Sequence, residues 1–392
     1  MTTRAIPGRI ERFIIVYALA WAGGAIAYTP FLTLLMPERI AGLVGPTRAV
    51  DWLSALAFCG AIAASFAHIG FGYLSDVTRN RRGWIAAGLV LSGGFLALFP
   101  YANGFWELAS LIVCWQLALN MMLGPLGALA GDVVPDARKG TLGGFLAFAP
   151  ALGAASGALV TWPGLLAMEI RPVIVACLVV LCVAPVLLIR LPPTVDHPVP
   201  AKGPDRPQRP RSIVVRMWLA RLSLQIAEAA LFAFLYLWFR AVDPTLGASR
   251  TAIIFGAVLA VSAPIALIVG RWADRHDRPL APLSLTAAIS AIGLVSMALA
   301  QGTAPAIAAY GLFGIASSVF LALHSAQTLR VLPRPSRRGR DLGIFNLTNT
   351  TPSLVMPALA LTLVPKFGFS GLFVMLAVLA ALAAILVPRR DP

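Results

Sequence analysis

Charged side chains are scarce in this sequence. Asp, Glu, Lys and Arg together make up 12% of its 392 residues, whereas 59% are hydrophobic and the mean hydropathy is +0.83. Soluble globular domains carry roughly 25% charged residues, so this composition excludes an ordinary soluble globule. Long apolar stretches recur along most of the chain, which indicates a protein that crosses a membrane several times.

Alternation of polar and apolar residues is also lacking in these stretches, for example at 84–100 and 371–388. Only helices and closed barrels satisfy their backbone hydrogen bonds within a bilayer, and barrel strands alternate. We therefore predict an all-α polytopic membrane protein whose helices each need ~20 apolar residues. Twelve spans are expected, at about 12–36, 52–74, 84–102, 106–130, 141–162, 171–190, 213–239, 251–270, 281–300, 304–329, 342–363 and 368–388.

Acidic residues are few: 16 stand against 31 Lys and Arg, which gives a net charge of +15 and a pI near 10.9. Such a balance could indicate nucleic-acid binding, but most of the basic residues fall in the termini and loops that twelve spans place on one side. By the positive-inside rule this side is cytoplasmic. The sequence thus predicts a multi-pass protein of the cell (inner or plasma) membrane, with both termini cytoplasmic and no nucleic-acid partner. The first span lacks a small-residue cleavage site, so we expect a retained helix.

Cysteine is rare, and the motifs of several kinds of chemistry are missing. Cys59, Cys114, Cys177 and Cys182 all fall within predicted spans without metal-ligand spacing, so no disulfide, metal or cofactor is expected. The sequence has no Gly-x-x-x-x-Gly-Lys-Ser/Thr loop, which argues against an ATP-driven pump. It also offers no nucleophile–base pair at depth, so we do not expect an enzyme.

The chain looks duplicated. GYLSD at 72–76 recurs as GRWAD at 270–274, and Pro135 recurs as Pro333, so both offsets are 198 residues. Between these copies, residues 191–211 are rich in proline and charge, which is typical of an extended linker. We predict three parts: an N-terminal six-helix bundle at 1–190, a cytoplasmic linker at 191–212 and a C-terminal six-helix bundle at 213–392.

The stretch GYLSDVTRNRRG at 72–83 joins helices 2 and 3 of this prediction. With its echo after helix 8, it resembles the signature loop of the major facilitator superfamily of transporters, and the resemblance extends over the whole chain through helix count, repeat and linker. Within the superfamily it is similar to the loop of the sugar–cation symporters that include melibiose and sucrose carriers, as is RGRDLGIFNLTNTTP at 338–352. The resemblance implies the major facilitator fold, alternating access, and a cavity lined by helices 1, 4, 7 and 10.

Two departures refine what the resemblance implies. Sodium-coupled members of the sugar–cation group use acidic residues in helix 2, whereas residues 52–74 contain none, so proton coupling is preferred. Drug antiporters of the superfamily carry Gly-Pro-x-x-Gly-Gly in helix 5. Here FAPALGAASG at 148–157 is a degraded match, which weakens drug export as a function without excluding it.

Charges at the ends of helices 2 and 8 are expected to latch the two halves together on the cytoplasmic side when the transporter is open outward. Asp76 would be stabilised by the dipole and free N–H groups of helix 11 near 341–345, and Asp274 likewise by helix 5 near 140–143. The alternative is that the loop arginines only mark the cytoplasmic side. The predicted latch also includes Arg79, Arg81 and Arg82, which can reach Asp132, together with Arg138, Arg275 and the close-packing glycines Gly72 and Gly270.

Helix 7 carries the ionisable residues of the predicted membrane interior. Arg221, Gln225 and Glu228 are spaced four and three apart, so they share one face. Burial disfavours a charged carboxylate and a nearby cation favours it, so Glu228 is the predicted proton-coupling residue with Arg221 as its partner. The alternative is a permanent pair that holds the bundle together. Seven residues span ~10 Å of helix, so each side chain is expected to find a partner on another helix.

Polar and aromatic stripes fall on the helices that the resemblance makes cavity-lining. Amides beside aromatic faces suit a neutral polyhydroxylated solute, because it needs many hydrogen bonds and a flat apolar wall. Each residue has packing as its alternative, and we interpret His68 with Ser65 on helix 2 as packing. The predicted substrate-binding residues are Tyr17, Trp21, Tyr28, Gln116, Asn120, Gln225, Glu228, His324, Asn346 and Asn349.

These observations together predict a secondary active transporter that moves a small polar, sugar-like solute by alternating access, in symport with protons. The alternative is a proton-coupled exporter of amphipathic compounds or drugs, which the aromatic content and the buried acid would also allow. The expected partners are the small-molecule substrate, protons and the lipid bilayer, and the expected state is a monomer.

Overall fold

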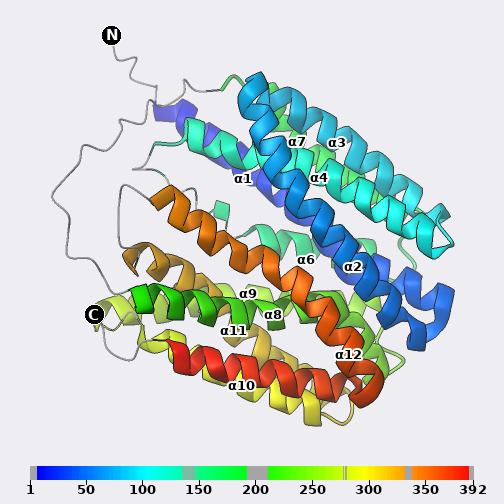
Figure 1. Ribbon diagram of the computed structural model, residues 1–392. Helices are drawn as coiled ribbons and strands as arrows, with labels where there is room; N and C mark the ends of the chain where they lie inside the picture. Colours follow the sequence, from blue (N-terminus) through cyan, green and yellow to red (C-terminus); the bar gives the residue numbers. More distant parts are fainter. Residues whose placement is uncertain are drawn as a thin grey trace. The chain divides into compact units, whose positions relative to one another are not determined.

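The chain folds into helices throughout the part that the computed structural model describes (Figure 1). These residues are 7–135, 138, 142, 145–146, 148–191, 211–276, 278, 280–331 and 338–387. The all-α prediction is therefore confirmed. The predicted linker lies almost wholly outside the described residues, as do the backbone of 140–141 and the side chains of Asp274, Asn346 and Asn349.

Two compact units make up the chain. Unit 1 comprises Met1–His197 with Ala248–Ile253, and unit 2 comprises Pro198–Gly247 with Ile254–Pro392. The predicted division at 190 and 213 stays a prediction, because the residues around it are among those not described.

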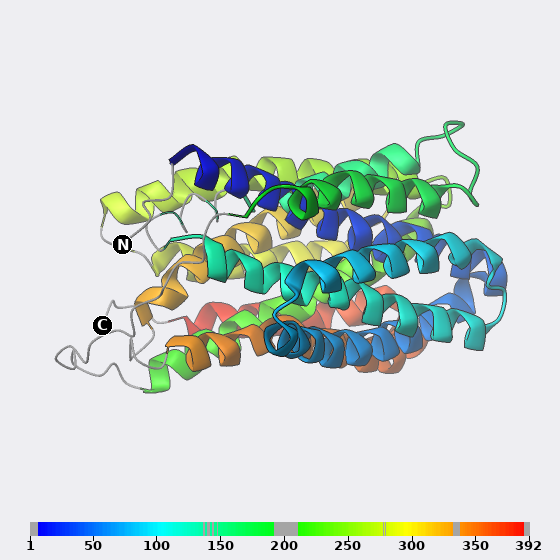
Figure 2. The same ribbon diagram turned by 90° about the horizontal axis from the view of Figure 1, so that it is seen from above.

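In unit 1, α4 packs against both α2 and α3, and α1 packs against both α6 and α7. Helices α3 and α4 run side by side in both views (Figures 1 and 2). The elements of this unit are α1 (Pro7–Pro30), the π-helical turn η1 (Phe31–Leu35), α2 (Met36–Thr78), α3 (Arg81–Leu98), the 3₁₀ turn η2 (Phe99–Tyr101), α4 (Phe105–Val133), α6 (Ala149–Val160) and α7 (Arg171–Leu188).

The first span is longer than predicted. Its helix does not end near 36 but continues to Gly45, whose φ of 75° breaks it, so the first span is Gly8–Gly45. The predicted span ended before the charged residues Glu38 and Arg39. Both charges instead find partners: a Glu38 oxygen lies 3.1 Å from Arg171 at the start of α7, and Arg39 donates to the Pro100 carbonyl at 2.9 Å. A charged residue stays helical here because the neighbouring helix ends satisfy it.

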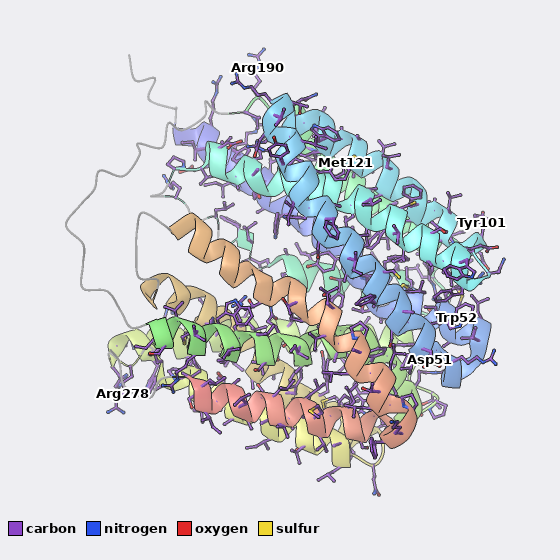
Figure 3. All side chains as sticks on the ribbon, in the orientation of Figure 1. Asp51, Trp52, Tyr101, Met121, Arg190 and Arg278 are labelled. Carbon is purple, nitrogen blue, oxygen red and sulfur yellow. The ribbon has the colours of Figure 1, made fainter. Side chains whose placement is uncertain are left out.

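The helices of unit 1 have two distinct ends. Asp51, Trp52 and Tyr101 lie at one end, and Arg190 lies at the other (Figure 3). We call the end that carries Arg190 and the residues of 76–83 the motif end, and the end that carries Tyr101 the opposite end.

In unit 2, α8 packs against α11 and α12, and α10 packs against the same two helices. Residue Gly368, with φ of 65°, interrupts α12, which thereby joins the eleventh and twelfth predicted spans. The elements of this unit are α8 (Arg211–Val242), α9 (Ala248–Arg275, of which Ala248–Ile253 belongs to unit 1), α10 (Ala281–Leu299), α11 (Thr303–Val331) and α12 (Arg338–Leu386).

Ten helices of the described residues are long and apolar enough to cross a membrane. Helix α6, at Ala149–Val160, is a shorter apolar helix within the predicted fifth span. The last of the ten, Thr351–Leu386, covers the two spans that meet at Gly368. The polytopic helical architecture predicted from composition is thus the observed one.

Candidate functional site

Arg81 is the centre of the signature loop. It stands at the first turn of α3, and its guanidinium lies 2.7 Å from an Asp76 oxygen at the end of α2. On its other side the guanidinium binds both oxygens of Asp132 at the end of α4, with Nη2 at 3.3 Å from Oδ1. The Ser75 hydroxyl accepts a further bond at 3.0 Å. One side chain, 19% exposed, therefore ties the ends of three helices together.

The other arginines predicted in the latch lie in different surroundings from Arg81. The sequence placed Arg79 and Arg82 within reach of Asp132, but Arg79 is exposed and ends α2 with φ of 51°, and Arg82 donates to the Ile189 carbonyl at the end of α7. Arg138, also predicted in the latch, lies 3.4 Å from Glu11 of α1. The arginines thus bind four different helices of unit 1 at the motif end.

Gly72, a predicted close-packing glycine, lies where α2 approaches Gly124 of the neighbouring helix α4. A Cβ on Gly124 would lie 2.9 Å from the His68 carbonyl oxygen and 3.3 Å from the Gly72 nitrogen. A Cβ on Gly72 itself would meet no described heavy atom within 4 Å. In unit 2, a Cβ on Gly270 would meet the Leu323 side chain at 3.3 Å, so that glycine does face a neighbouring helix.

The second copy of the motif ends α9. Arg275 is exposed there, and the His276 ring stacks on the Trp272 ring with centroids 4.8 Å apart. The His276 Nδ1 also lies 2.9 Å from the Trp272 carbonyl oxygen. These contacts stay within the last turns of one helix.

The predicted aromatic stripe of α1 divides into a buried part and a partly buried part. Tyr17 is 1% exposed, and its ring lies between those of Phe13 and Trp21, at centroid distances of 5.7 and 6.3 Å. Trp21 and Tyr28 are partly buried against the alanine core formed by Ala22, Ala25 and Ala149. Packing within unit 1 therefore accounts for Tyr17, while Trp21 and Tyr28 keep accessible ring surface.

A hydrogen-bonded chain of polar side chains joins α2 to α4. His68 Nδ1 lies 3.2 Å from Asn120 Oδ1. The Asn120 amide nitrogen donates to the Gln116 carbonyl at 2.9 Å and lies 3.4 Å from Gln116 Oε1. The structure brings together the two predicted amides of α4 and adds His68, which the sequence analysis assigned to packing. We call His68, Gln116 and Asn120 the α2–α4 polar patch.

Glu228 lies halfway along α8 and bonds to α11. The Ser317 hydroxyl donates to Glu228 Oε1, and the same hydroxyl lies 3.2 Å from the Gly314 carbonyl oxygen. Ser317 is fully buried and Glu228 is half-buried. Ser317 is a partner that the sequence analysis missed, because serine is common in membrane helices and its pairing depends on which residues α8 and α11 bring together.

Arg221 forms hydrogen bonds with residues of α11 and α12, and Glu228 is not among these partners. Its Nε lies 3.1 Å from the Thr348 hydroxyl oxygen on α12, and its Nη1 lies 3.5 Å from the Leu321 carbonyl oxygen on α11. Near it, His324 is fully buried, and its Nε2 lies 2.9 Å from the Met217 carbonyl oxygen. Gln225, between Arg221 and Glu228 on α8, is half-buried. Arg221 and Glu228 therefore contact different residues of α11 and α12.

Comparison with known proteins gives a consistent assignment. The Major Facilitator Superfamily profile matches residues 13–300 and 217–392. A search of curated proteins finds no match. Among solved structures, the chain is similar to a bacterial homolog of the human lysosomal transporter Spinster, in an inward-facing and occupied conformation, with a TM-score of 0.75 and 13% identity over 96% of each chain.

The inward-facing, unoccupied conformation of that homolog matches with a TM-score of 0.69 and 13% identity, over 97% of this chain and 95% of the other. At this identity the likeness shows the fold. The profile match spans nearly the whole chain, including both units. The chain therefore belongs to the major facilitator superfamily of membrane transporters.

Proposed function

We propose that this transporter moves a small polar, sugar-like solute by alternating access in symport with protons, as a monomer in the cell membrane with its termini in the cytoplasm. The observation that carries the proton coupling is the contact of Glu228 with Ser317 inside a membrane span. An acid within a span is costly to keep charged, and such residues mark ion and proton pathways.

The Ser317 hydroxyl suits an acid that changes its protonation. It has one proton and two acceptors in reach, Glu228 Oε1 and the Gly314 carbonyl oxygen. When Glu228 is a carboxylate, Ser317 donates to it. When Glu228 is protonated, its O–H donates to the Ser317 oxygen and the Ser317 proton turns to Gly314. Both states are satisfied without a change of packing, which supports Glu228 as the carrier of the proton.

The α2–α4 polar patch supports the choice of substrate class. Its three side chains carry neutral donors and acceptors, which match hydroxyl groups rather than a charged ligand. The partly buried rings of Trp21 and Tyr28 on α1 offer the apolar surface that a sugar ring packs against. Asn346 and Asn349, whose side chains are not among those described, stay predicted substrate-binding residues.

The test is charge movement by the purified protein in liposomes. An inward proton gradient is imposed, and currents are recorded on adding saccharides and other polar metabolites one at a time. We expect a current for one chemical class, and loss of that current in Glu228→Gln. A control without the gradient separates proton-driven current from leak.

Silence across the panel from protein shown to be folded would overturn the sugar-like substrate. The same vesicles then test the alternative, export of amphipathic compounds, by loading a fluorescent amphipathic cation and reversing the proton gradient. The aromatic content of the sequence and the acid Glu228 within a span are the features that favour this second candidate. Proton-driven efflux of the dye, lost in Glu228→Gln, would establish it.

A further inference from the structure

His68 is an exposed imidazole inside a membrane span. It lies on α2 within the span Arg48–Thr78, and its ring is exposed although its Nδ1 contacts Asn120 on α4. Its backbone is pressed against α4, because the His68 carbonyl oxygen lies where a Cβ on Gly124 would approach to 2.9 Å. The residue is thus fixed in place while one edge of its ring stays uncovered.

The hydrogen bonds of Asn120 decide which ring nitrogen of His68 carries the proton. The Asn120 amide nitrogen donates to the Gln116 carbonyl oxygen, which accepts only, so the side-chain oxygen of Asn120 must face His68. An oxygen acceptor at 3.2 Å requires N–H at Nδ1. In a neutral imidazole Nε2 then has a lone pair and is an acceptor.

His68 is a polar side chain within a membrane span. A polar side chain within a span usually faces a protein interior or a water-filled cavity, because hydrocarbon offers no hydrogen bond. The other members of the α2–α4 polar patch sit beside it, with Gln116 half-buried and Asn120 8% exposed. In the neutral imidazole the patch therefore ends in one acceptor, Nε2, on an exposed residue, and Asn120 and Gln116 hold the orientation of the ring.

We propose that His68 is a further residue of the substrate site, and that its Nε2 accepts a hydrogen bond from a hydroxyl group of the solute. This inference rests on the proposed function, since it names a residue that recognises the polar solute. The ligand chemistry follows from the tautomer: an acceptor selects a hydroxyl donor and has nothing to offer a group that only accepts. Asn120 and Gln116 then act through His68 as positioning residues.

The experiment uses the full-length protein in liposomes and three saccharides, sucrose, melibiose and D-glucose, with the monodeoxy derivatives of the sugar that gives a current. In His68→Phe the ring is kept but its hydrogen bonds are lost. We expect the half-saturating concentration of the parent sugar to rise about tenfold, the effect of one lost neutral hydrogen bond, with little change in maximal current.

The deoxy derivatives separate contact from mere support. One derivative should bind wild type about tenfold more weakly than the parent sugar does, yet show no further loss in His68→Phe, because the missing hydroxyl and the missing acceptor remove the same bond. If His68 only held Asn120 in place, each deoxy derivative would bind more weakly than the parent sugar by the same factor in wild type and in His68→Phe. That result would show the inference to be wrong. His68→Gln, which restores an acceptor, should recover part of the affinity.

Ser65→Ala is the matched control. Ser65 stands one turn earlier on α2, and its hydroxyl donates to the Ala61 carbonyl of its own helix at 2.8 Å, so its loss should leave the half-saturating concentration unchanged. Unchanged affinity in His68→Phe, with wild-type currents, would overturn the role of His68 alone. Absence of current from folded wild type with every saccharide would overturn the proposed function and this inference together.

Discussion

The two units place their polar side chains in opposite ways. In unit 1, the described ion pairs lie at the helix ends, as with Arg81 at the motif end and Arg171 at the opposite end, and the mid-span polar patch is neutral. In unit 2, ionisable Glu228 and Arg221 lie within the helix α8 that spans the membrane. Under the proposed function, hydrogen-bond recognition of the solute falls in unit 1 and proton coupling falls in unit 2.

The duplicated motif shows the same divergence. Both copies keep Gly-x-x-x-Asp at the end of a helix, yet the first copy ties α2, α3 and α4 together through Arg81. In the second copy, the described contacts of His276 return to Trp272 in its own helix. Both copies keep the helix end and its acid, and among the described side chains, which do not include that of Asp274, the network that joins several helices belongs to the first copy.

The largest effect is expected from removing the acid of unit 2. Glu228→Gln should abolish accumulation of substrate against its gradient, because an amide cannot pick up and release a proton. Exchange of labelled for unlabelled substrate should persist, since the Ser317 hydroxyl still finds an oxygen to bond. Both assays are run on the same vesicles, and accumulation that survives the substitution would remove Glu228 from the coupling step. Glu228→Asp, which keeps a titratable group, is the matched control.

A smaller effect is expected at the motif end of unit 1. Asp76→Asn should slow turnover several-fold while the protein stays folded, because Asp76 is 58% exposed and Arg81 keeps its bonds to Asp132. Asp132→Asn removes the carboxylate that binds Arg81 through both oxygens, and the Arg81 side chain is only 19% exposed. This substitution should instead lower the melting temperature. Turnover is measured at matched protein content per vesicle, and a wild-type rate in Asp76→Asn would exclude the predicted latch.

Much of the fold was predictable because membrane burial leaves a compositional signal, and each apolar run became a helix. The predicted first span ended at 36, before Glu38, whose partner Arg171 is distant in sequence. In the candidate site, Asn120 and Glu228 could be chosen because amides and acids are rare in spans. Their partners His68 and Ser317 could not, since these pairs depend on how α2 meets α4 and how α8 meets α11.

Each unit has a glycine at a close contact between two helices, and replacing it with alanine should destabilise both units alike. A Cβ on Gly88 of α3 would lie 2.7 Å from the Ala118 carbonyl oxygen, and one on Gly293 of α10 would lie 2.6 Å from the Phe313 nitrogen. Each would push against helix backbone, so Gly88→Ala and Gly293→Ala should each destabilise the protein by ~1–3 kcal/mol.

The controls for this comparison are Gly94→Ala on α3 and Gly311→Ala on α11, where a Cβ meets no described heavy atom within 4 Å. Without a clash, alanine should be neutral or stabilising, because glycine is the poorer helix former. Thermal unfolding in detergent ranks all four variants. Equal melting temperatures for Gly88→Ala and Gly94→Ala would contradict the close approach of α3 to α4.

The smallest effect is expected at the solvent-exposed ion pair of unit 1, between Arg138 and Glu11. Arg138 and Glu11 are 3.4 Å apart with side chains 45% and 57% exposed, whereas Arg81 is 19% exposed and holds two carboxylates. Exposed pairs contribute about 0–1 kcal/mol, because water solvates the separated charges nearly as well. Arg138→Ala should therefore shift the melting temperature little, and Arg81→Ala should lower it clearly. If the two arginines proved equal, the stability of the motif end would come from helix packing, and its ion pairs would serve the movement between states alone.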